Sequence, residues 1–357
     1  MVALDRYYKG AVELLRKIVT IKSYSFEEEE CSIYLYNYLK SKNIDCKRIK
    51  NNIVAYPTSF SDSKPTLMLN SHIDTVKESD TYTFDATNPP LSDEVVWGLG
   101  SNDAGGCVVS LIQTFLYFND NPQLLNNLSY NLVLALSTEE ERSGPNGMSY
   151  LTSHLEGIDC AIVGEPTSMK GAIAERGLLV IDATSKGKSG HAARNEGINA
   201  IYIAIEDIDK IRNFTFDKVS PLMGDVNMSV TQINAGYAHN VIPDSCSFVV
   251  DIRPTDCYTN PEIMDILSKE LKSELKPRSL TNKSSATPIG HPLLNTLKKS
   301  NIESFISPTT SDWMRLSIPA VKIGPGDSAR SHRADEYIKI SEIEMGIDGY
   351  IKLIENL

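Results

Sequence analysis

The sequence TLMLNSHID (residues 66–74) joins a short apolar run to a histidine and an aspartate. Continuous apolar runs of this length are typical of strands buried on both faces of a parallel sheet. Three other segments follow the same plan: LVLALS (132–137) before Glu139-Glu140-Glu141, CAIVG (160–164) before Glu165, and AVKIG (320–324) ahead of Ser331-His332. In open α/β sheets, ligands bind at the carboxyl ends of such strands. The pattern therefore predicts histidine and carboxylate side chains at one edge of a sheet, most simply as a metal site.

The composition is typical of a globular protein with excess negative charge. A chain of 357 residues can form one large or two ordinary domains. Its net charge of −11 argues against binding to nucleic acid or to an anionic membrane. The acidic run Glu27 to Glu30 is interpreted as the solvated first turn of a helix.

The cysteines and the first residues bear on the compartment. The six cysteines include no C-x-x-C pair, and Cys107 and Cys160 lie in apolar contexts typical of a core. The segment 1–19 carries charges throughout and shows helical spacing, which is unlike a signal peptide or a membrane span. We therefore expect a reduced, cytoplasmic protein.

Strand and helix patterns alternate on both sides of a central insertion. We expect helices near 5–20, 27–42 and 146–155, a long helix opened by Asp103, and strands near 44–56, 66–71, 130–138 and 160–164. This alternation predicts an α/β domain, formed by residues 1–172 and 286–357, with a mostly parallel central sheet covered by helices.

The segment 173–285 has a different pattern. We expect strands near 173–185, 225–234, 245–253 and 278–286, with helices near 197–211 and 260–275. The order βαββαβ predicts a compact α+β, ferredoxin-like domain. Because this segment lies between Glu165 and His332, we expect it to be an inserted domain.

His72 and Asp103 are the first candidate metal ligands. In His72-x-Asp74, Asp74 is placed to hold the second ring nitrogen of a ligand histidine, although a solvated surface histidine would give the same pattern. Asp103 follows the glycine-rich stretch 97–102, where the backbone can approach a ligand closely. An aspartate that caps the following helix is the structural alternative.

Glu139 and Glu140 would point different ways if the strand pleat continued through them. That geometry suits one metal ligand and one carboxylate free for proton transfer. With Glu165 and His332 added, the candidate ligands number five, which is one too many for a single tetrahedral zinc. Two metal ions that share a bridging aspartate would use them all.

The motifs together resemble a known family. They are His72-x-Asp74, Gly98-x-Gly100-x-x-Asp103, Glu139-Glu140, Gly164-Glu165-Pro166-Thr167 and Ser331-His332. In this order they resemble the M20 family of zinc amidohydrolases and exopeptidases, which includes acetylornithine deacetylase and succinyl-diaminopimelate desuccinylase. The likeness spans essentially the whole chain.

The resemblance implies a site with two zinc ions and Asp103 between them. His72 and Glu165 would hold one ion, and Glu140 and His332 would hold the other. Cobalt or manganese would fit the same ligands. Glu139 would then be the general base.

The resemblance also implies the roles of further catalytic-domain residues. Asp74 would support His72, and a cis peptide would join Asp103 to Ala104. Two positions depart from the family pattern, because Leu99 stands where the family usually has arginine and Gly105 where it usually has lysine. Neither is a ligand, so catalysis should survive, while the pocket loses two positive charges.

The inserted segment resembles the lid or dimerisation domain of the family. His191 in Ser-Gly-His-Ala would reach the active site of a partner subunit and help to polarise the scissile carbonyl. Asn240 and Arg253 resemble substrate-binding positions, the arginine gripping a carboxylate. A turn histidine and a structural salt bridge are the alternatives for His191 and Arg253. A homodimer through this domain is expected.

By this resemblance the protein removes an acyl group from a small-molecule N-acyl amino acid. N2-acetylornithine, a substrate of arginine biosynthesis, is favoured over N-acetylcitrulline, the N-succinyl forms of ornithine or citrulline, and succinyl-diaminopimelate. A dipeptidase or carboxypeptidase of the same fold is a further alternative. A non-catalytic amino-acid-binding protein is the hypothesis outside enzymes, and it has no need for Glu139 beside the ligands.

Overall fold

The computed structural model describes residues 4–194 and 196–357, which form two compact units. The larger unit comprises the chain up to Ile173, Thr287–Phe305 and Ser311–Leu357. The smaller unit comprises Ala174–Ala286 and Ile306–Thr310. The ranges expected from the sequence did not include the return of Ile306–Thr310 to the smaller unit.

The larger unit is built on a nine-stranded sheet, most of which lies within its own residue ranges. Its strands are β1 (Asp45–Ile49), β2 (Asn52–Tyr56), β3 (Thr66–His72), β5 (Asn131–Ser137), β6 (Cys160–Val163), β7 (Gly171–Glu175), β14 (Ser285–Ala286), β15 (Ser304–Ser307) and β16 (Ala320–Lys322). They follow the order β1-β2-β5-β3-β6-β16-β7-β14, and β15 pairs with β7. Only β14 and the last two residues of β7 and of β15 fall within the residue ranges of the smaller unit. A separate ribbon joins β4 (Val95–Trp97) to β17 (Tyr337–Lys339).

The centre of this sheet is parallel, as expected. β3 pairs in parallel with β5 and β6, and β16 pairs in parallel with β6. Every residue of β3 and β5 is buried, which matches their unbroken apolar sequences. The carboxyl ends of these four strands therefore lie along one edge of the sheet.

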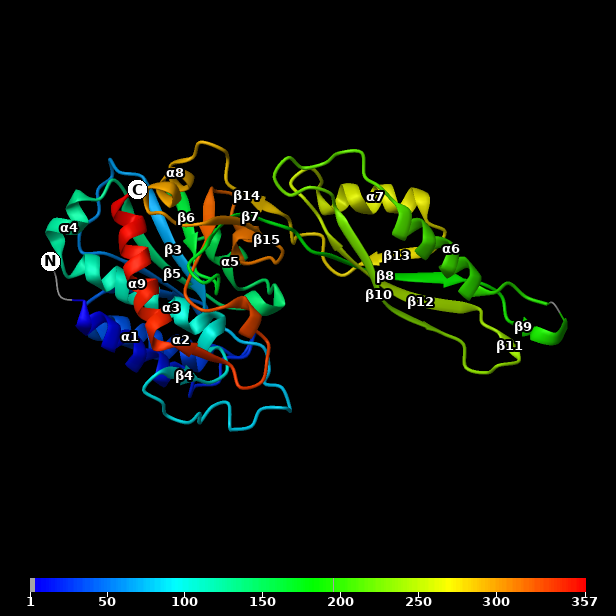
Figure 1. The fold of residues 1–357 in the computed structure, drawn as a ribbon, viewed down its shortest axis with the longest axis horizontal. Helices are drawn as coiled ribbons and strands as arrows, with labels where there is room; N and C mark the ends of the chain where they lie inside the picture. The colour runs from blue at the N-terminus through cyan, green and yellow to red at the C-terminus, as the bar shows by residue number, and fades with distance from the viewer. Residues whose placement is uncertain (1–3, 195) are drawn as a thin grey trace. The chain divides into compact units, whose positions relative to one another are not determined.

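Helices cover the faces of the sheet (Figure 1). They are α1 (Asp5–Ile18), α2 (Glu29–Ser41), α3 (Gly106–Asn119), α4 (Pro122–Asn127), α5 (Met148–Thr152), α8 (Pro292–Lys299) and α9 (Ile340–Glu355). α3 is apolar around its circumference and is buried throughout, because it packs on β3 and β5 and is covered by α1 and α9. This helix fixes the loop that precedes it, which carries Asp103.

The sequence boundaries differed from the structure at three places. The first is the strand expected near 278–286: β13 (Glu274–Pro277) ends before it, and β14 covers only Ser285–Ala286. The strand expected near 44–56 is the antiparallel hairpin β1–β2, which turns at Lys50 with a positive φ of 54°. The strand expected near 173–185 is divided between β7 and β8 (Leu179–Lys186), which belong to different sheets.

The smaller unit has the predicted βαββαβ order. Its elements are β8, α6 (Ala200–Asn213), β10 (Asn227–Ala235), β12 (Ser245–Arg253), α7 (Asn260–Glu270) and β13 (Glu274–Pro277), with a short ribbon of β9 (Gly190–His191) and β11 (Val241–Ile242). The antiparallel strand order β10-β12-β8-β13 is that of a ferredoxin-like sheet. Alternate residues of β8 and β12 are buried, and α6 and α7 share their core (Figure 1).

Two general expectations can be compared with this structure. The six cysteines are free thiols, and Cys107 and Cys160 lie in the core. Across residues 4–194 and 196–357, no helix has both the length and the apolar character needed to cross a bilayer.

Candidate metal centre

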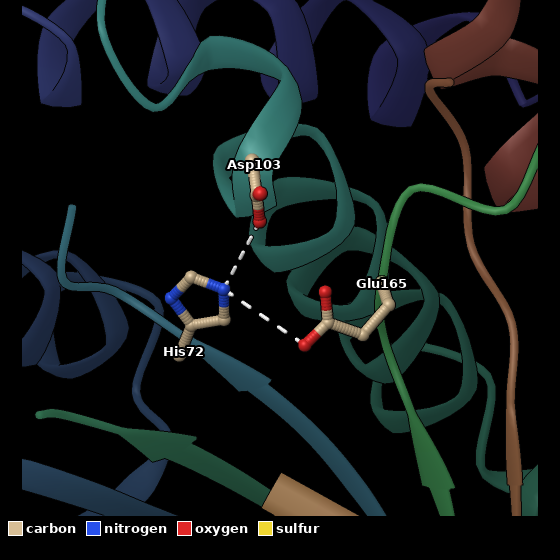
Figure 2. Close-up of side chains that lie close together, drawn as sticks. All are labelled: His72, Asp103 and Glu165. Carbon is tan, nitrogen blue, oxygen red and sulfur yellow. Dashed lines mark hydrogen bonds and ion pairs between the residues drawn. The ribbon is translucent and has the colours of Figure 1, made fainter. Parts of the chain in front are cut away.

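The first group of candidate ligands is His72, Asp103 and Glu165 (Figure 2). His72 ends β3 and is only 1% exposed, which excludes the solvated surface histidine. Its Nε2 lies 3.3 Å from Oδ1 of Asp103 and 3.9 Å from Oε1 of Glu165. Glu165 follows β6, the strand paired with β3, so the sheet register brings these two side chains together.

The second group is Asp103, Glu141 and His332. Nε2 of His332 lies 2.9 Å from Oε2 of Glu141 and 3.7 Å from Oδ2 of Asp103. The two carboxylate oxygens of Asp103 thus face different histidines, Oδ1 toward His72 and Oδ2 toward His332. This is the arrangement that a carboxylate between two metal ions requires.

The loop that carries Asp103 is not a helix cap. α3 begins at Gly106, its N-cap is Gly105, and no side chain caps it. Asp103 itself has extended dihedral angles, φ −120° and ψ 95°, in the turn before the helix. The expected cis peptide between Asp103 and Ala104 is confirmed.

Asp74 contacts both His72 and the turn that carries Glu141. Nδ1 of His72 lies 3.0 Å from the carbonyl oxygen of Asp74 and 3.4 Å from its Oδ1. The Asp74 carboxylate also accepts hydrogen bonds from the backbone N–H groups of Glu140 (3.0 Å) and Glu141 (3.1 Å) and from Oγ of Ser25 (2.7 Å). One buried carboxylate therefore supports a histidine of the first group and the turn that carries Glu141.

The centre has more carboxylates than the histidines can neutralise. Burial raises the pKa of Glu165 to about 8, and the nearby Asp103 adds to this effect. Burial also raises the pKa of Glu140 well above its ordinary value, with Glu165 and Glu141 acting in the same direction. Burial opposes protonation of His72, but the hydrogen bonds with Asp103 and Asp74 raise its pKa well above the ordinary value. A cluster of nitrogen and oxygen donors with this charge fits divalent cations.

The structure differs from the sequence expectation at the glutamate run. Glu141, rather than Glu140, lies against His332. β5 ends at Ser137, and Glu139 then adopts a left-handed conformation with φ 58° before a 3-10 turn over Glu140–Arg142. The pleat therefore does not continue through these residues, and the assignment that assumed it is displaced by one position.

Glu139 points away from the ligands into its own loop. Its Oε2 accepts a hydrogen bond from the backbone N–H of Asn146 at 2.8 Å, and its Oε1 accepts one from the Asn146 side chain at 2.9 Å. The carboxylate of Glu140, by contrast, has His72, Glu165 and Glu141 as electrostatic neighbours. Within the described residues, it makes no side-chain hydrogen bond or ion pair.

Three buried residues that support the centre were not identified from the sequence. Glu28 belongs to the acidic run expected in solvent, but it is buried and accepts a hydrogen bond from the backbone N–H of Glu139 at 3.2 Å. Asp312 accepts a hydrogen bond from Ser137, and burial raises its pKa to about 6. Glu336 contacts the loop of Asp103. The sequence signal for Glu336 was its place four residues after His332.

The two departures from the family pattern have structural reasons. A Cβ at Gly105 would lie 2.4 Å from the carbonyl oxygen of Gly100 and 2.8 Å from Cδ1 of Leu15, so no lysine fits there without movement. Leu99 is buried with Tyr24 and Ala86 in a small apolar cluster. Apolar packing replaces the two missing cations at these positions.

The other three candidate residues lie in the smaller unit. His191 pairs with Val241 in the β9–β11 ribbon, and its Nδ1 accepts a hydrogen bond from the N–H of Ala193 at 3.2 Å. The carbonyl of Asn240 accepts a hydrogen bond from the N–H of Ala192 at 3.1 Å, so Asn240 and His191 are neighbours. Arg253 forms a bidentate ion pair with Asp251 at 2.7 and 3.0 Å, as the structural alternative expected.

Comparison with known proteins finds two matching family models and several relatives. The model of peptidase family M28 matches residues 51–171, and the M20 peptidase dimerisation domain matches residues 173–279. An acetylornithine deacetylase of Buchnera aphidicola is 26% identical over 96% of both chains. An uncharacterized metallohydrolase of Methanocaldococcus jannaschii is 29% identical over 90% of both chains.

The chain thus resembles the M20 family of metallohydrolases and carries the peptidase dimerisation domain of that family.

Solved structures share its fold. An M20 metallo-carboxypeptidase of Sulfolobus solfataricus aligns with a TM-score of 0.76 at 16% identity, over 97% of this chain and 98% of that chain. A tripeptidase of Staphylococcus aureus aligns with a TM-score of 0.77 at 18% identity, over 98% of both chains. Taken with the family models and the curated relatives, these matches support a hydrolase that acts on amide bonds.

Proposed function

We propose that this M20 enzyme is a dizinc deacylase of N-acyl amino acids, with N2-acetylornithine as its substrate in arginine biosynthesis. The observation that carries the metal centre is the carboxylate of Asp103, whose oxygens face His72 and His332 separately. We assign one zinc to His72, Asp103 and Glu165, and the other to Asp103, Glu141 and His332. Bound zinc would supply Lewis acidity toward water and toward the amide carbonyl.

The protein side chains divide the remaining work. We assign the general base to Glu140, because its buried carboxylate interacts electrostatically with His72, Glu165 and Glu141 and makes no hydrogen bond among the described residues. It would take the proton of the attacking water and deliver it to the departing amine. Asp74 holds His72 and the Glu140–Glu141 turn in place. Glu139, the base expected from the sequence, is committed to Asn146.

The choice of substrate is supported by the relatives. The acetylornithine deacetylase of Buchnera aphidicola aligns over 96% of both chains, so neither protein carries a large additional segment in that alignment. The two replaced cations at Leu99 and Gly105 distinguish this pocket from the usual family pattern. N-acetylcitrulline and the N-succinyl amino acids are the competing substrates.

Release of free amine by the zinc-loaded protein tests this function. The panel contains N2-acetylornithine, N-acetylcitrulline, N-succinylornithine, succinyl-diaminopimelate and free dipeptides. A kcat/KM for N2-acetylornithine at least about tenfold above the others, a difference of about 1.4 kcal/mol in transition-state binding, supports the proposal. Cleavage of dipeptides alone would make the enzyme a peptidase. No turnover by zinc-loaded protein would overturn the deacylase assignment.

We also propose that the smaller unit forms a homodimer. Its helix α6 exposes Tyr202 (67%) and Ile205 (53%), and the edge strand β10 exposes Ile233 (52%). An apolar helix face beside an unpaired strand edge suits a second copy of the same chain. His191, exposed in the same unit, would act in the site of the partner copy.

Light scattering of a Tyr202→Asp/Ile205→Asp variant tests the dimer. The variant is expected to be monomeric. Its turnover should fall about as far as that of His191→Ala, because a monomer has no partner copy to supply His191 to its site. A wild-type monomer with full activity would contradict both the dimer and the role of His191.

A further inference from the structure

Glu336 is a buried carboxylate that contacts the metal-binding loop. Its side chain is 3% exposed. Its Oε1 accepts hydrogen bonds from the backbone N–H groups of Asn102 and Asp103, both at 2.8 Å, and its Oε2 accepts one from the N–H of Gly100 at 3.0 Å. One side chain therefore binds three of the amides that lead up to and include Asp103.

Glu336 also belongs to the segment that carries His332. The two residues are four apart in the sequence, and Glu336 immediately precedes β17. The carbonyl oxygen of Glu336 accepts a hydrogen bond from the N–H of Gly98 at 3.0 Å, where β17 pairs with β4. Backbone and side chain thus join the His332 segment to the loop of Asp103.

A second link connects the same two segments. The side chain of Asn102 donates to the carbonyl oxygen of Asp327 at 3.0 Å and accepts from its N–H at 2.9 Å. Asp327 lies five residues before His332. The loop before Asp103 is therefore held to the His332 segment on both sides of that histidine.

The two ligand groups need such links to different degrees. In the first group, His72 and Glu165 follow paired strands of the sheet, and the register of β3 and β6 sets their separation. In the second group, Asp103 and His332 both lie in loops outside the strands. The nearest strand pairing, that of Trp97 with Tyr337, lies six residues from Asp103 and five from His332, so it sets their separation only indirectly.

We propose that Glu336 is a positioning residue, which sets the place of Asp103 relative to His332 and thereby the metal affinity of the second group. The inference rests on the metal centre proposed above. The Glu336 carboxylate acts through three backbone amides. Supports of this kind typically change metal affinity by about 10–100-fold.

The nature of the contact predicts a graded response to substitution. Glu336→Ala removes both acceptor oxygens, and with them the three hydrogen bonds that they accept from buried backbone N–H groups. Glu336→Gln keeps the shape and one acceptor oxygen, but its amide group must place N–H against at least one backbone N–H. The glutamine variant should therefore lie between the wild type and the alanine variant.

Asp207 provides a matched control. It is a fully buried carboxylate of the smaller unit, and it accepts hydrogen bonds from the backbone N–H groups of Lys272 (3.1 Å) and Ser273 (2.8 Å). It contacts none of the candidate ligands. Asp207→Asn therefore removes a comparable buried acceptor without touching the metal-binding loops.

Zinc titration of the metal-free proteins by calorimetry tests the proposal, with absorption spectra of the cobalt-loaded proteins as a second readout. Wild type should bind two ions. In Glu336→Ala one of the two sites, which we assign to the second group, should lose about 10–100-fold in affinity and change its cobalt spectrum, while the other site stays within about threefold. Asp207→Asn should bind both ions as wild type does, even if its Tm falls.

The outcomes separate the two proposals. If wild type binds two ions and both Glu336 variants match it, the positioning role is wrong and the metal centre stands. If wild type binds no zinc, the proposed metal centre fails and the positioning role fails with it. If Glu336→Ala does not fold, Glu336→Gln decides by the same titration.

Discussion

The two ligand groups of the centre are built in different ways. The first takes His72 and Glu165 from the ends of β3 and β6, in a setting where His72 is 1% exposed. The second takes Glu141 and His332 from turns, and the side chain of His332 is 55% exposed with a positive φ of 57°. Asp103 belongs to both.

The positions of the ligands are therefore fixed in two different ways. Strand pairing places the first group, because every residue of β3 has a fixed partner in β5. Hydrogen bonds between distant side chains and backbone place the second group, such as that from the N–H of Glu141 to Asp74. A centre of this kind should therefore respond to mutation differently on its two sides.

The largest expected effect comes from the glutamate run. Glu140→Gln should lower kcat by about 10²–10⁴-fold with both metal ions still bound, because the base is lost and no ligand is. Glu141→Gln should lose metal from the second group. Glu139→Gln should keep metal and most activity while losing about 1–2 kcal/mol of stability, since it weakens the contacts with Asn146.

Metal content, kcat and denaturant unfolding of the three variants make this a direct comparison. The assignment would be reversed if Glu139→Gln were the inactive, metal-replete variant, because Glu139 would then be the base that the sequence suggested.

The second prediction compares the two histidines. His72→Ala and His332→Ala should each lose one metal ion per chain, because each histidine serves one group. Their metal-free stabilities should differ. His72→Ala removes a buried side chain and its contacts with Asp74, at a cost of about 1–3 kcal/mol. His332→Ala removes a half-exposed ion pair, with a cost within about 1 kcal/mol.

Elemental analysis of dialysed protein and urea unfolding in chelator measure the two quantities. Equal destabilisation by both substitutions would show that burial does not separate the groups.

These contrasts also explain how far the sequence could be interpreted. His72 and Glu165 were predicted because apolar runs mark buried strands, and parallel strands end at one edge of a sheet. The ligand was assigned to Glu140 and the base to Glu139, one position earlier than the structure indicates, because the directions of these side chains depend on the end of β5 and on the left-handed Glu139. The burial of Glu28 in an acidic run depends on a contact 111 residues away. No local pattern encodes such a contact.

The third prediction tests a support that serves both groups. The Asp74 carboxylate accepts hydrogen bonds from the N–H groups of Glu140 and Glu141 and from Oγ of Ser25. Asp74→Asn keeps the shape of the side chain but replaces one of the two acceptor oxygens by an N–H donor. We expect metal affinity or kcat/KM to fall by about 10–100-fold. Because Asp74 contacts residues of both ligand groups, zinc titration of Asp74→Asn should show weaker binding at both sites, whereas Glu336→Ala should weaken only one. Loss at one site only would mean that Asp74 supports a single group.

The smallest expected effect is the pH dependence of stability in metal-free protein. Glu141 raises the pKa of His332 to about 9 from an ordinary 6.5, and burial raises the pKa of Glu165 to about 8 from an ordinary 4.5. In both cases the folded state binds its proton more tightly than the unfolded state does. Stability from His332 is therefore complete below about pH 6.5 and is lost as the pH rises through 9; that from Glu165 is lost between about 4.5 and 8.

The Tm of metal-free protein should thus fall between pH 6.5 and 9. His332→Ala should show a shallower fall over this range, because the His332 contribution is lost while those of Glu165 and Glu336, whose pKa burial also raises to about 8, remain. Bound zinc should reverse the trend, since deprotonated ligands bind metal better as the pH rises. Thermal melts in chelator at pH 6.5, 7.5 and 9 measure this. A metal-free Tm that rises with pH over this range would mean that the cluster of carboxylates is neutralised by something other than protons.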